Sequence, residues 1–291
     1  MHGSCQSGSG EAAGDRHMAV EYSSDEEWAG HLVAFVRAGL EQGEQMRYFS
    51  DATEPDRVTR TLMDRGVDAA AAVRRGQLVV ATADETYLAG GRFDPDMMVG
   101  LWHEAVAAAA AQGFRGLRAI GEMSWGGRDI SGVGRLLEYE LRIHHEVFER
   151  LPLRAWCFYD RRLLPRDDLS VLVGAHVKRS AAGSAGHGRR GLSAAPLTGP
   201  PGFRWEGSAG YESRRVVDSA AAALAASPVR DITLDLSGLD HLDIATLARI
   251  ADAARRRPTG PPVRVLGAPP ALHRMLRLFP ELGAGLEVAE Q

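Results

Sequence analysis

The stretch Leu234–Ile250, LDLSGLDHLDIATLARI, decides the fold of the C-terminal part of the chain. It begins with the alternating apolar residues of a β-strand, passes through a short polar run that contains Asp243, and ends with the apolar spacing of a helix. Such strand–turn–helix elbows build α/β domains, and their polar turns carry ligand or partner sites. The stretch therefore predicts an α/β domain with a functional elbow.

Composition shifts divide the 291 residues into two ordered parts. Residues 1–14 are mostly Gly, Ser and small polar types, which predicts a flexible leader. Residues 179–202 are rich in Gly, Pro, Ala and Ser without apolar periodicity, which predicts a linker. The sequence thus predicts one domain over residues 15–178 and a smaller one over residues 203–291.

Predicted strands and helices alternate in both parts. In the first part, strands are expected at 46–50, 77–81, 117–119 and 154–159, with helices at 26–42, 57–64, 94–112 and 134–151. In the second part, strands are expected at 231–236 and 263–266, with helices at 210–226, 244–256 and 270–279. This alternation is typical of mainly parallel sheets with flanking helices.

Charge and composition exclude several classes of partner. The formal net charge of −4 provides no broad basic surface for phosphates, so no direct nucleic-acid partner is expected. No stretch approaches about 18 consecutive apolar residues, so no membrane segment is expected. The only cysteines are Cys5 and Cys157, too few for a disulfide framework. We therefore expect a cytoplasmic protein.

A nucleotide cofactor is not expected. The phosphate-binding pattern GxxxxGK[ST] is missing, and the nearest Gly-rich run is GEMSWGGRDISGVG at 121–134. Its glycines are equally suited to line a ligand with backbone N–H groups or to form turns. The sequence therefore predicts no cofactor, and ATP in particular is not expected.

Histidines are considered as metal ligands. In EYELRIHHE, Glu140 and His144 lie four residues apart on one helical face, a spacing that suits a metal or an ordinary ion pair. No HExxH or paired CxxC accompanies them, so no metal is assigned, and His144 and His145 remain the candidates. A metal- or haem-binding sensor that uses His17, His144, His145 or His176 stays open as an alternative.

Aromatic and acidic residues lie at the ends of predicted strands or on the predicted helix between them. They are Trp125, Tyr139, Trp156, Tyr159, Glu122, Glu140 and Asp160. The carboxyl ends of parallel strands form ligand crevices, so these residues suit a small organic molecule, although a plain aromatic core explains them equally well. Cys157 lies in an apolar strand and is expected to be inert, and no GxSxG motif supplies another nucleophile.

The first part resembles the MEDS (methanogen/methylotroph sensory) domain over about residues 14–178. The resemblance is carried by GDRHMAVEYSSDEE, LEQGEQMRYFSD, GQLVVATADETYLAGGRFDPDMM, GLRAIGEMSW, LLEYE, CFYD and LSVLVGAH. It implies a RecA-like α/β domain without a working phosphate loop, used in signalling proteins to sense small hydrocarbon-like ligands. The ligand-binding positions that the resemblance implies are His17, Glu44, Arg118, Glu122, Trp125, Glu140, Tyr159, Asp160 and His176.

The second part resembles a STAS domain, the sulfate-transporter and anti-sigma-factor-antagonist module, over about residues 203–289. The resemblance is carried by ITLDLSGLDHLDIATLARI and PVRVLGAPPALHRMLRLFPEL. In that family an Asp is followed by a Ser that a partner kinase phosphorylates. Here Asp243 is followed by Ile244, which has no hydroxyl, and Thr246 is only a displaced acceptor. The replacement of this Ser by Ile244 does not affect the predicted STAS fold, but it removes the usual phosphorylation site.

Together these features predict a cytoplasmic regulatory protein. The MEDS-like domain would sense a small organic molecule, and the STAS-like domain would dock on an anti-sigma factor or a related kinase-fold protein through Asp240, Asp243, Ile244 and Thr246. Homo-oligomerisation is possible. The competing class is an enzyme or ligand carrier in which Glu122 or Glu140 acts as general acid or base and Trp125 contributes to the pocket. Enzymatic activity is the less favoured of these functions.

Overall fold

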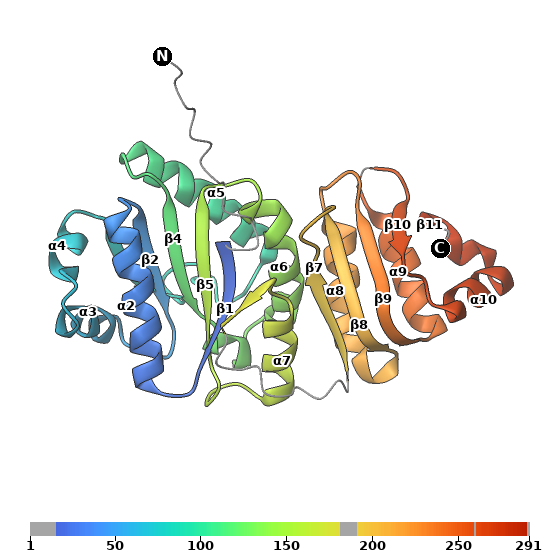
Figure 1. The fold of residues 1–291 in the computed structure, drawn as a ribbon, viewed down its shortest axis with the longest axis horizontal. Coiled ribbons are helices and arrows are strands. Elements are labelled where there is room, and N and C mark those ends of the chain that lie inside the picture. Colours follow the sequence, from blue (N-terminus) through green and yellow to red (C-terminus); the bar gives the residue numbers. More distant parts are fainter. Residues whose placement is uncertain (1–15, 181–190, 259, 290–291) are drawn as a thin grey trace, which may run out of the picture.

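A computed structural model of the protein describes residues 16–180, 191–258 and 260–289 (Figure 1). The predicted leader, residues 1–14, lies outside the described residues. Two sheets stand side by side, each covered by helices, and they correspond to the two predicted α/β parts (Figure 1).

Within the described residues, the first sheet has six strands in the order β3-β2-β4-β5-β1-β6, and all its pairs are parallel. The strands are β1 (His17–Tyr22), β2 (Gln45–Ser50), β3 (Leu78–Thr82), β4 (Leu117–Glu122), β5 (Leu153–Asp160) and β6 (Lys178–Arg179). The predicted mainly parallel sheet is confirmed. The sequence analysis did not predict β1, and this strand places His17 beside the central strand β5.

Helices cover both faces of this sheet. They are α2 (Asp25–Glu41), α3 (Pro55–Asp64), α4 (Ala69–Arg74), α5 (Pro95–Ala111), α6 (Leu136–Ile143) and α7 (Arg166–Gly174). The Ser24 hydroxyl caps α2 by accepting the Glu27 N–H, and Asp94 caps α5 ahead of Pro95. Buried side chains of α2, α3 and α4 form one core cluster, and those of α5, α6 and α7 belong to another.

The predicted helix over 134–151 differs from the structure. Helix α6 ends at Ile143 and passes into one π-helical turn, η3 (His144–Phe148). A π-turn inserts one residue per turn and rotates the following side chains, and such turns are frequent at functional sites. The run that precedes α6 forms the short 3₁₀ turns η1 (Ser124–Gly127) and η2 (Val133–Arg135).

The second sheet has five strands in the order β11-β10-β9-β8-β7. They are β7 (Leu192–Pro196), β8 (Gly202–Ala209), β9 (Thr233–Leu242), β10 (Val263–Leu266) and β11 (Leu286–Val288), with helices α8 (Arg214–Ala226), α9 (Ile244–Arg256) and α10 (Pro270–Leu278). Short 3₁₀ turns, η5 (Tyr211–Ser213) and η6 (Pro280–Gly283), precede α8 and follow α10. The β7–β8 pair is antiparallel, and the other pairs are parallel.

The predicted linker, residues 179–202, contains strand β7, which corrects that prediction for residues 192–196. Leu192 and Ala194 are buried in the alternating pattern of a strand, and Pro196 ends it. A proline is acceptable there because β7 is the edge strand of its sheet. The abundance of Gly and Pro around this short alternation obscured it in the sequence.

The two parts share one continuous core. The cluster that begins at Ala19 in β1 and includes α5 and α6 continues through Phe203 in β8 to Leu272 in α10. Helix α6 packs against α8 and β7, and every one of its residues is buried. Helix α6 is therefore covered on both sides, by its own sheet and by the second domain (Figure 1).

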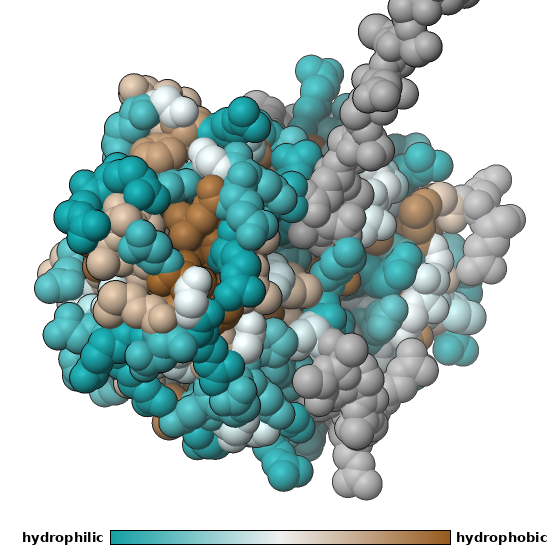
Figure 2. All heavy atoms as spheres, turned by 60° about the vertical axis from the view of Figure 1, so that its left-hand side comes forward, coloured by the Kyte–Doolittle hydropathy of each residue, from teal (hydrophilic) through white to brown (hydrophobic). Residues whose placement is uncertain are grey.

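The opposite end of the first domain faces solvent. In Figure 2 this end is mostly hydrophilic, with one hollow in which apolar side chains gather. Large exposed apolar residues on its elements include Met63, Val73 and Val79. In the part of the chain that the structure describes, no helix combines the length and apolarity needed for a membrane span.

Candidate functional site

A small buried cavity lies on the α5–α6 face of the first sheet. Its volume is about 30 Å³, which is enough to hold a water molecule. Its walls are mostly aromatic and apolar, and they include Phe49, Tyr87, Met98, Trp102, Met123, Trp125, Tyr139, Ile143 and Phe148. Of the aromatic residues expected to form a binding site, Trp125 and Tyr139 thus line the cavity, whereas the Trp156 ring packs against Phe35 on the opposite face of the sheet.

Polar side chains form one wall of this cavity. His17 and Cys157 extend from the paired strands β1 and β5, and Glu140 reaches them from α6. His17 Nε2 lies 3.4 Å from both Glu140 Oε2 and Cys157 Sγ. His176, which follows α7, places its Nε2 3.4 Å from the same Glu140 oxygen. We call His17, Glu140, Cys157 and His176 the buried polar cluster.

Neighbouring groups set the orientation of this cluster. The His176 Nδ1 lies 3.0 Å from the Leu172 carbonyl oxygen, which only accepts, so Nδ1 carries the proton and Nε2 carries a lone pair. The His17 ring stacks on Phe148 with 4.5 Å between ring centroids. The Tyr159 hydroxyl donates to Glu140 Oε1 over 3.5 Å.

Burial controls the charge of these groups. Loss of solvation lowers the pKa of His17 to about 3, and burial with help from His17 lowers the pKa of His176 to about 3. Burial raises the pKa of the Glu140 carboxyl, and burial followed by the Glu140 charge raises the pKa of the Cys157 thiol. The protein interior therefore disfavours every charge that the cluster could carry on its own.

Glu122 lies on the opposite face of the sheet. Its Oε2 accepts the backbone N–H groups of Asp51, Ala52 and Thr53 at 2.8, 2.9 and 3.0 Å. Its Oε1 accepts the Tyr48 hydroxyl. Three converging N–H groups at the end of β2 resemble an anion site, and in this chain Glu122 occupies it.

The remaining positions implied by the MEDS resemblance lie elsewhere. Arg118 pairs with Glu44 near the start of β4, and Asp160 pairs with Arg162. Trp125 lines the cavity. The structure therefore brings together His17, Glu140, Tyr159 and His176, with Trp125 across the cavity, and separates them from the other ligand-binding positions predicted from the sequence.

The Gly-rich run at 121–134 serves turns and close packing. Gly132 has a φ of +84°, and a Cβ there would lie 2.1 Å from the Phe93 carbonyl oxygen. A Cβ on Gly126 would lie 2.9 Å from Leu136 Cδ2. The geometry of Gly126 and Gly132 thus supports the turn interpretation, whereas Gly121, at the start of the run, lines the cavity.

His144 and His145 lie apart from Glu140, although His144 follows it by four residues. The π-turn directs both rings toward Glu149, with His145 Nδ1 3.0 Å from Glu149 Oε2 and His144 Nε2 3.7 Å from Oε1. The Gly202 N–H donates to His145 Nε2 at 3.1 Å. His145 therefore connects η3 to the first residue of β8 in the second domain.

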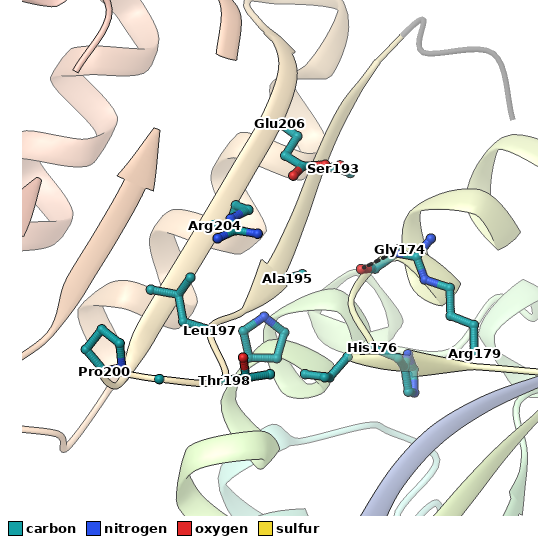
Figure 3. Close-up of a pocket in the computed structure, with 13 residues that line it drawn as sticks. Gly174, His176, Arg179, Ser193, Ala195, Leu197, Thr198, Pro200, Arg204 and Glu206 are labelled. Carbon is teal, nitrogen blue, oxygen red and sulfur yellow. Dashed lines mark hydrogen bonds between the residues drawn. The ribbon is translucent and has the colours of Figure 1, made fainter. Parts of the chain in front are cut away.

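A larger hollow separates α7 and β6 from β7 and β8 (Figure 3). Its volume is about 330 Å³, and its lining includes His176, Arg179, Ser193 and Arg204. Arg204 is paired with Asp235. Because His176 lines the hollow and also belongs to the buried polar cluster, this residue forms part of the wall between them.

The predicted elbow joins β9 to α9. The Asp243 carboxylate caps α9 by accepting the Thr246 N–H at 2.7 Å. Asp240 is exposed, and Ile244 is 43% exposed. Thr246 is 3% exposed, and its hydroxyl donates to the Ala209 carbonyl oxygen at 3.3 Å. Of the four predicted docking residues, Thr246 is therefore enclosed in the fold.

Comparisons with protein families agree with this architecture. Residues 16–177, more than half of the chain, match the family described as MEDS, MEthanogen/methylotroph, DcmR Sensory domain. The chain belongs to the MEDS family. Residues 204–280 match the family described as Mlab, STAS domain. No curated protein matches the chain. The resemblance seen in the sequence is confirmed, and the MEDS–STAS pairing is that of a regulatory or signalling protein.

Cys157 and Phe148, which contact His17, were not among the site residues predicted from the sequence. Cys157 was expected to be inert because it lies within an apolar strand, and Phe148 was one apolar residue of a predicted helix. A usable signal was the spacing of Cys157 and Tyr159, since residues two apart on a strand share a face. Without strand β1, nothing connected that face with His17.

Proposed function

We propose that the MEDS domain binds a small apolar molecule in the cavity beside Glu140, and that the STAS domain relays its presence to a protein partner. The observation that supports this most is the position of α6 and η3. Tyr139, Glu140, Ile143 and Phe148 from this segment line the cavity. His145 of the same segment contacts Gly202. One continuous segment thus touches both the cavity and the second domain.

The small size of the cavity explains how ligand binding would change the conformation of the domain. Pockets for drug-sized ligands measure about 300–1,000 Å³, whereas this cavity measures about 30 Å³. A ligand larger than water therefore enters only if the wall moves. The ligand then binds a widened conformation better than the closed one, and this differential affinity is what shifts a conformational equilibrium.

Gly121 in β4 offers a direct test of ligand entry. It lines the cavity, and a Cβ added there would meet only Met123 Sδ, at an ordinary 3.6 Å. Gly121→Ala therefore fills the cavity without strain. Gly30→Ala in α2 is the matched control, because a Cβ there meets nothing within 4 Å.

The experiment compares the two alanine variants with the wild-type chain. Native mass spectrometry and thermal shift with small aliphatic and halogenated hydrocarbons should show binding to the wild type and to Gly30→Ala. Gly121→Ala should bind about tenfold or more weakly, as one methyl group in an apolar pocket does. Equal affinity of both variants would contradict the proposed cavity.

The partner-docking surface is proposed at the elbow of the STAS domain. It consists of Asp240, His241, Asp243 and Ile244, joined by Tyr211, which is 82% exposed. Gly210, which precedes Tyr211, lies against the elbow, since a Cβ there would be 3.3 Å from Asp243 Oδ2. Tyrosine is enriched among the residues that dominate binding energy at protein interfaces, so the exposed Tyr211 supports an interaction surface here.

The proposed partner is an anti-sigma factor or a related kinase-fold protein. Binding of the full chain to candidate anti-sigma factors should weaken about tenfold or more in Ile244→Asp. Leu278→Asp on α10, also at an exposed apolar residue (72%), should bind like the wild type. Equal loss in both variants, or no binding of any kinase-fold protein, would contradict this docking surface. Because residue 244 carries no hydroxyl, no phosphate should be incorporated there.

A further inference from the structure

The buried polar cluster has the composition of a metal site. His17, Glu140, Cys157 and His176 come from β1, α6, β5 and the residues after α7, and their ligand atoms all lie within 4.8 Å of one another. Each of the four side chains is buried, with exposed fractions between 0 and 8%. Four potential ligands from four separate elements thus converge on one point inside the first domain.

The distances in this cluster suit ligands around an ion better than hydrogen bonds. The histidine nitrogens lie 3.4 Å from Glu140 Oε2, beyond the usual hydrogen-bond range of about 2.7–3.2 Å. Among the described residues, Glu140 Oε2 and His176 Nε2 have no hydrogen-bond partner. Both atoms are fully buried and face the same point. Leaving buried polar atoms without a hydrogen-bond partner is energetically unfavourable.

Tetrahedral geometry accounts for these separations. With metal–nitrogen and metal–oxygen bonds of about 2.0–2.2 Å, neighbouring N and O ligands lie about 3.3 Å apart, and N and S ligands about 3.5 Å apart. The corresponding separations here are 3.4 Å for His176 Nε2 to Glu140 Oε2 and 3.4 Å for His17 Nε2 to Cys157 Sγ. The widest separation between ligand atoms is no more than 4.8 Å, so it needs to close by at most about 1.4 Å.

The hydrogen bond made by His176 supports the same conclusion. Because Nδ1 donates to the Leu172 carbonyl, the Nε2 lone pair faces a Glu140 oxygen that also offers lone pairs. A cation between the two atoms satisfies both. Metal-bound histidines commonly donate their other N–H to a backbone carbonyl in this manner.

Charge and donor type select the ion. A carboxylate and a thiolate with two neutral imidazoles balance a divalent cation, which explains how Glu140 is held at 0% exposure. Nitrogen and sulfur donors favour Zn²⁺ and similar transition ions over Mg²⁺ or Ca²⁺. We infer that His17, Glu140, Cys157 and His176 bind one Zn²⁺-class ion.

An ion could reach the buried polar cluster from the hollow between the two domains. His176 forms part of the lining of the 330 Å³ hollow between the domains, so movement of this residue gives an ion a route to the cluster. The inference does not depend on the proposed function, because metal binding is measured on the purified chain whether or not it senses a ligand.

The test loads the full chain with Zn²⁺ and, separately, with Co²⁺. One equivalent per chain is expected, with the intense visible absorption of tetrahedral Co²⁺ and a near-ultraviolet Co–thiolate charge-transfer band. X-ray absorption of the Zn²⁺-loaded wild type should show one sulfur ligand at about 2.3 Å and the remainder nitrogen or oxygen at about 2.0–2.2 Å. This measurement needs no variant, so it holds even if a substitution prevents folding.

Variants identify the ligands. His176→Gln should bind Co²⁺ at least about a hundredfold more weakly, and Cys157→Ser should lose the charge-transfer band. The matched controls are His144→Gln, in the other histidine group, and Cys5→Ser, at the other cysteine, and both should behave like the wild type. Substoichiometric binding by the wild type, an X-ray spectrum without sulfur, or full binding by His176→Gln would each overturn the inference.

Discussion

Glu122 and Glu140 are both buried carboxylates of the MEDS domain, and they lie on opposite faces of one sheet in contrasting surroundings. Glu122 is 1% exposed and accepts three backbone N–H groups and the Tyr48 hydroxyl. Glu140 is 0% exposed, and its Oε2 has no hydrogen-bond partner among the described residues. The two carboxylates are therefore equally buried, but in the described part of the chain Glu122 has hydrogen-bond donors for both of its oxygens and Glu140 does not.

The difference separates a structural carboxylate from one available for binding. A buried carboxylate with a full set of donors holds its loop in place and has no capacity left for a ligand. A buried carboxylate with an unused oxygen retains that capacity. The comparison favours Glu140 over Glu122 as the group that meets a ligand or ion, and it can be tested with matched substitutions.

The largest expected effect is that of Glu122→Ala. The substitution leaves three backbone N–H groups and the Tyr48 hydroxyl without their acceptor, so the free energy of unfolding should fall by about 3–5 kcal/mol. Urea denaturation followed by circular dichroism measures this. A loss below about 1 kcal/mol would show that the loop after β2 does not depend on Glu122.

Removal of the tyrosine hydroxyl beside Glu122 should destabilise the fold more than removal of the one beside Glu140. Tyr48→Phe removes the donor to Glu122 and the acceptor of the Trp28 Nε1–H at 2.9 Å, and should cost about 1–3 kcal/mol. Tyr159→Phe removes only a 3.5 Å contact with Glu140 and should cost less than about 1 kcal/mol. Equal losses in the free energy of unfolding for the two variants, measured by urea denaturation, would contradict the proposed difference between Glu122 and Glu140.

His144 in η3 predicts a pH dependence of the free energy of unfolding. Burial, followed by the neighbouring His145, lowers the pKa of His144 to about 4. Between pH 6.5 and pH 4 the unfolded chain therefore binds a proton that the folded chain does not, and stability falls as the pH falls. Relative to His144→Gln, the wild type should lose on the order of 2 kcal/mol between pH 7 and pH 4. Parallel pH profiles would contradict this.

The smallest expected effect is that of Glu140→Gln in the metal-free chain. An amide of the same shape replaces a carboxylate whose Oε2 lacks a partner, so the free energy of unfolding should change by less than about 1 kcal/mol. Denaturation in the presence of a chelator, beside the matched Glu122→Gln, provides the measurement. A loss as large as that of Glu122→Gln would show that Glu140 is equally structural.

The order of elements could be predicted from the sequence, because long periodic helices such as α9 and apolar strands such as β2 carry strong local signals. Helix α9 begins and ends where predicted, at residues 244 and 256. Strands β1, β6, β7, β8 and β11 were not predicted. Strands β6 and β11 have only two and three residues, and β7 and β8 lie beside Gly and Pro residues that obscure a strand pattern. Strand β1 lies directly behind the Gly- and Ser-rich start of the chain.

The buried polar cluster could be predicted only in part. The MEDS resemblance named His17, Glu140 and His176, but the adjacency of β1 and β5, which places Cys157 beside His17, is a property of strand order. Helical spacing suggested Glu140 with His144, and the π-turn at residue 144 directs His144 toward Glu149 instead. Local sequence patterns predict neither the order of strands in a sheet nor a change from α-helix to π-helix.

Strand β7 has a practical consequence for any fragment of this protein. A STAS fragment cut at residue 203, as the composition of the chain suggests, would lack β7 and leave β8 as a bare sheet edge with Phe203 and Trp205 beside it. Bare apolar edges recruit other chains and aggregate. A fragment that starts before Leu192 keeps β7 as its edge strand and so avoids this bare edge of β8.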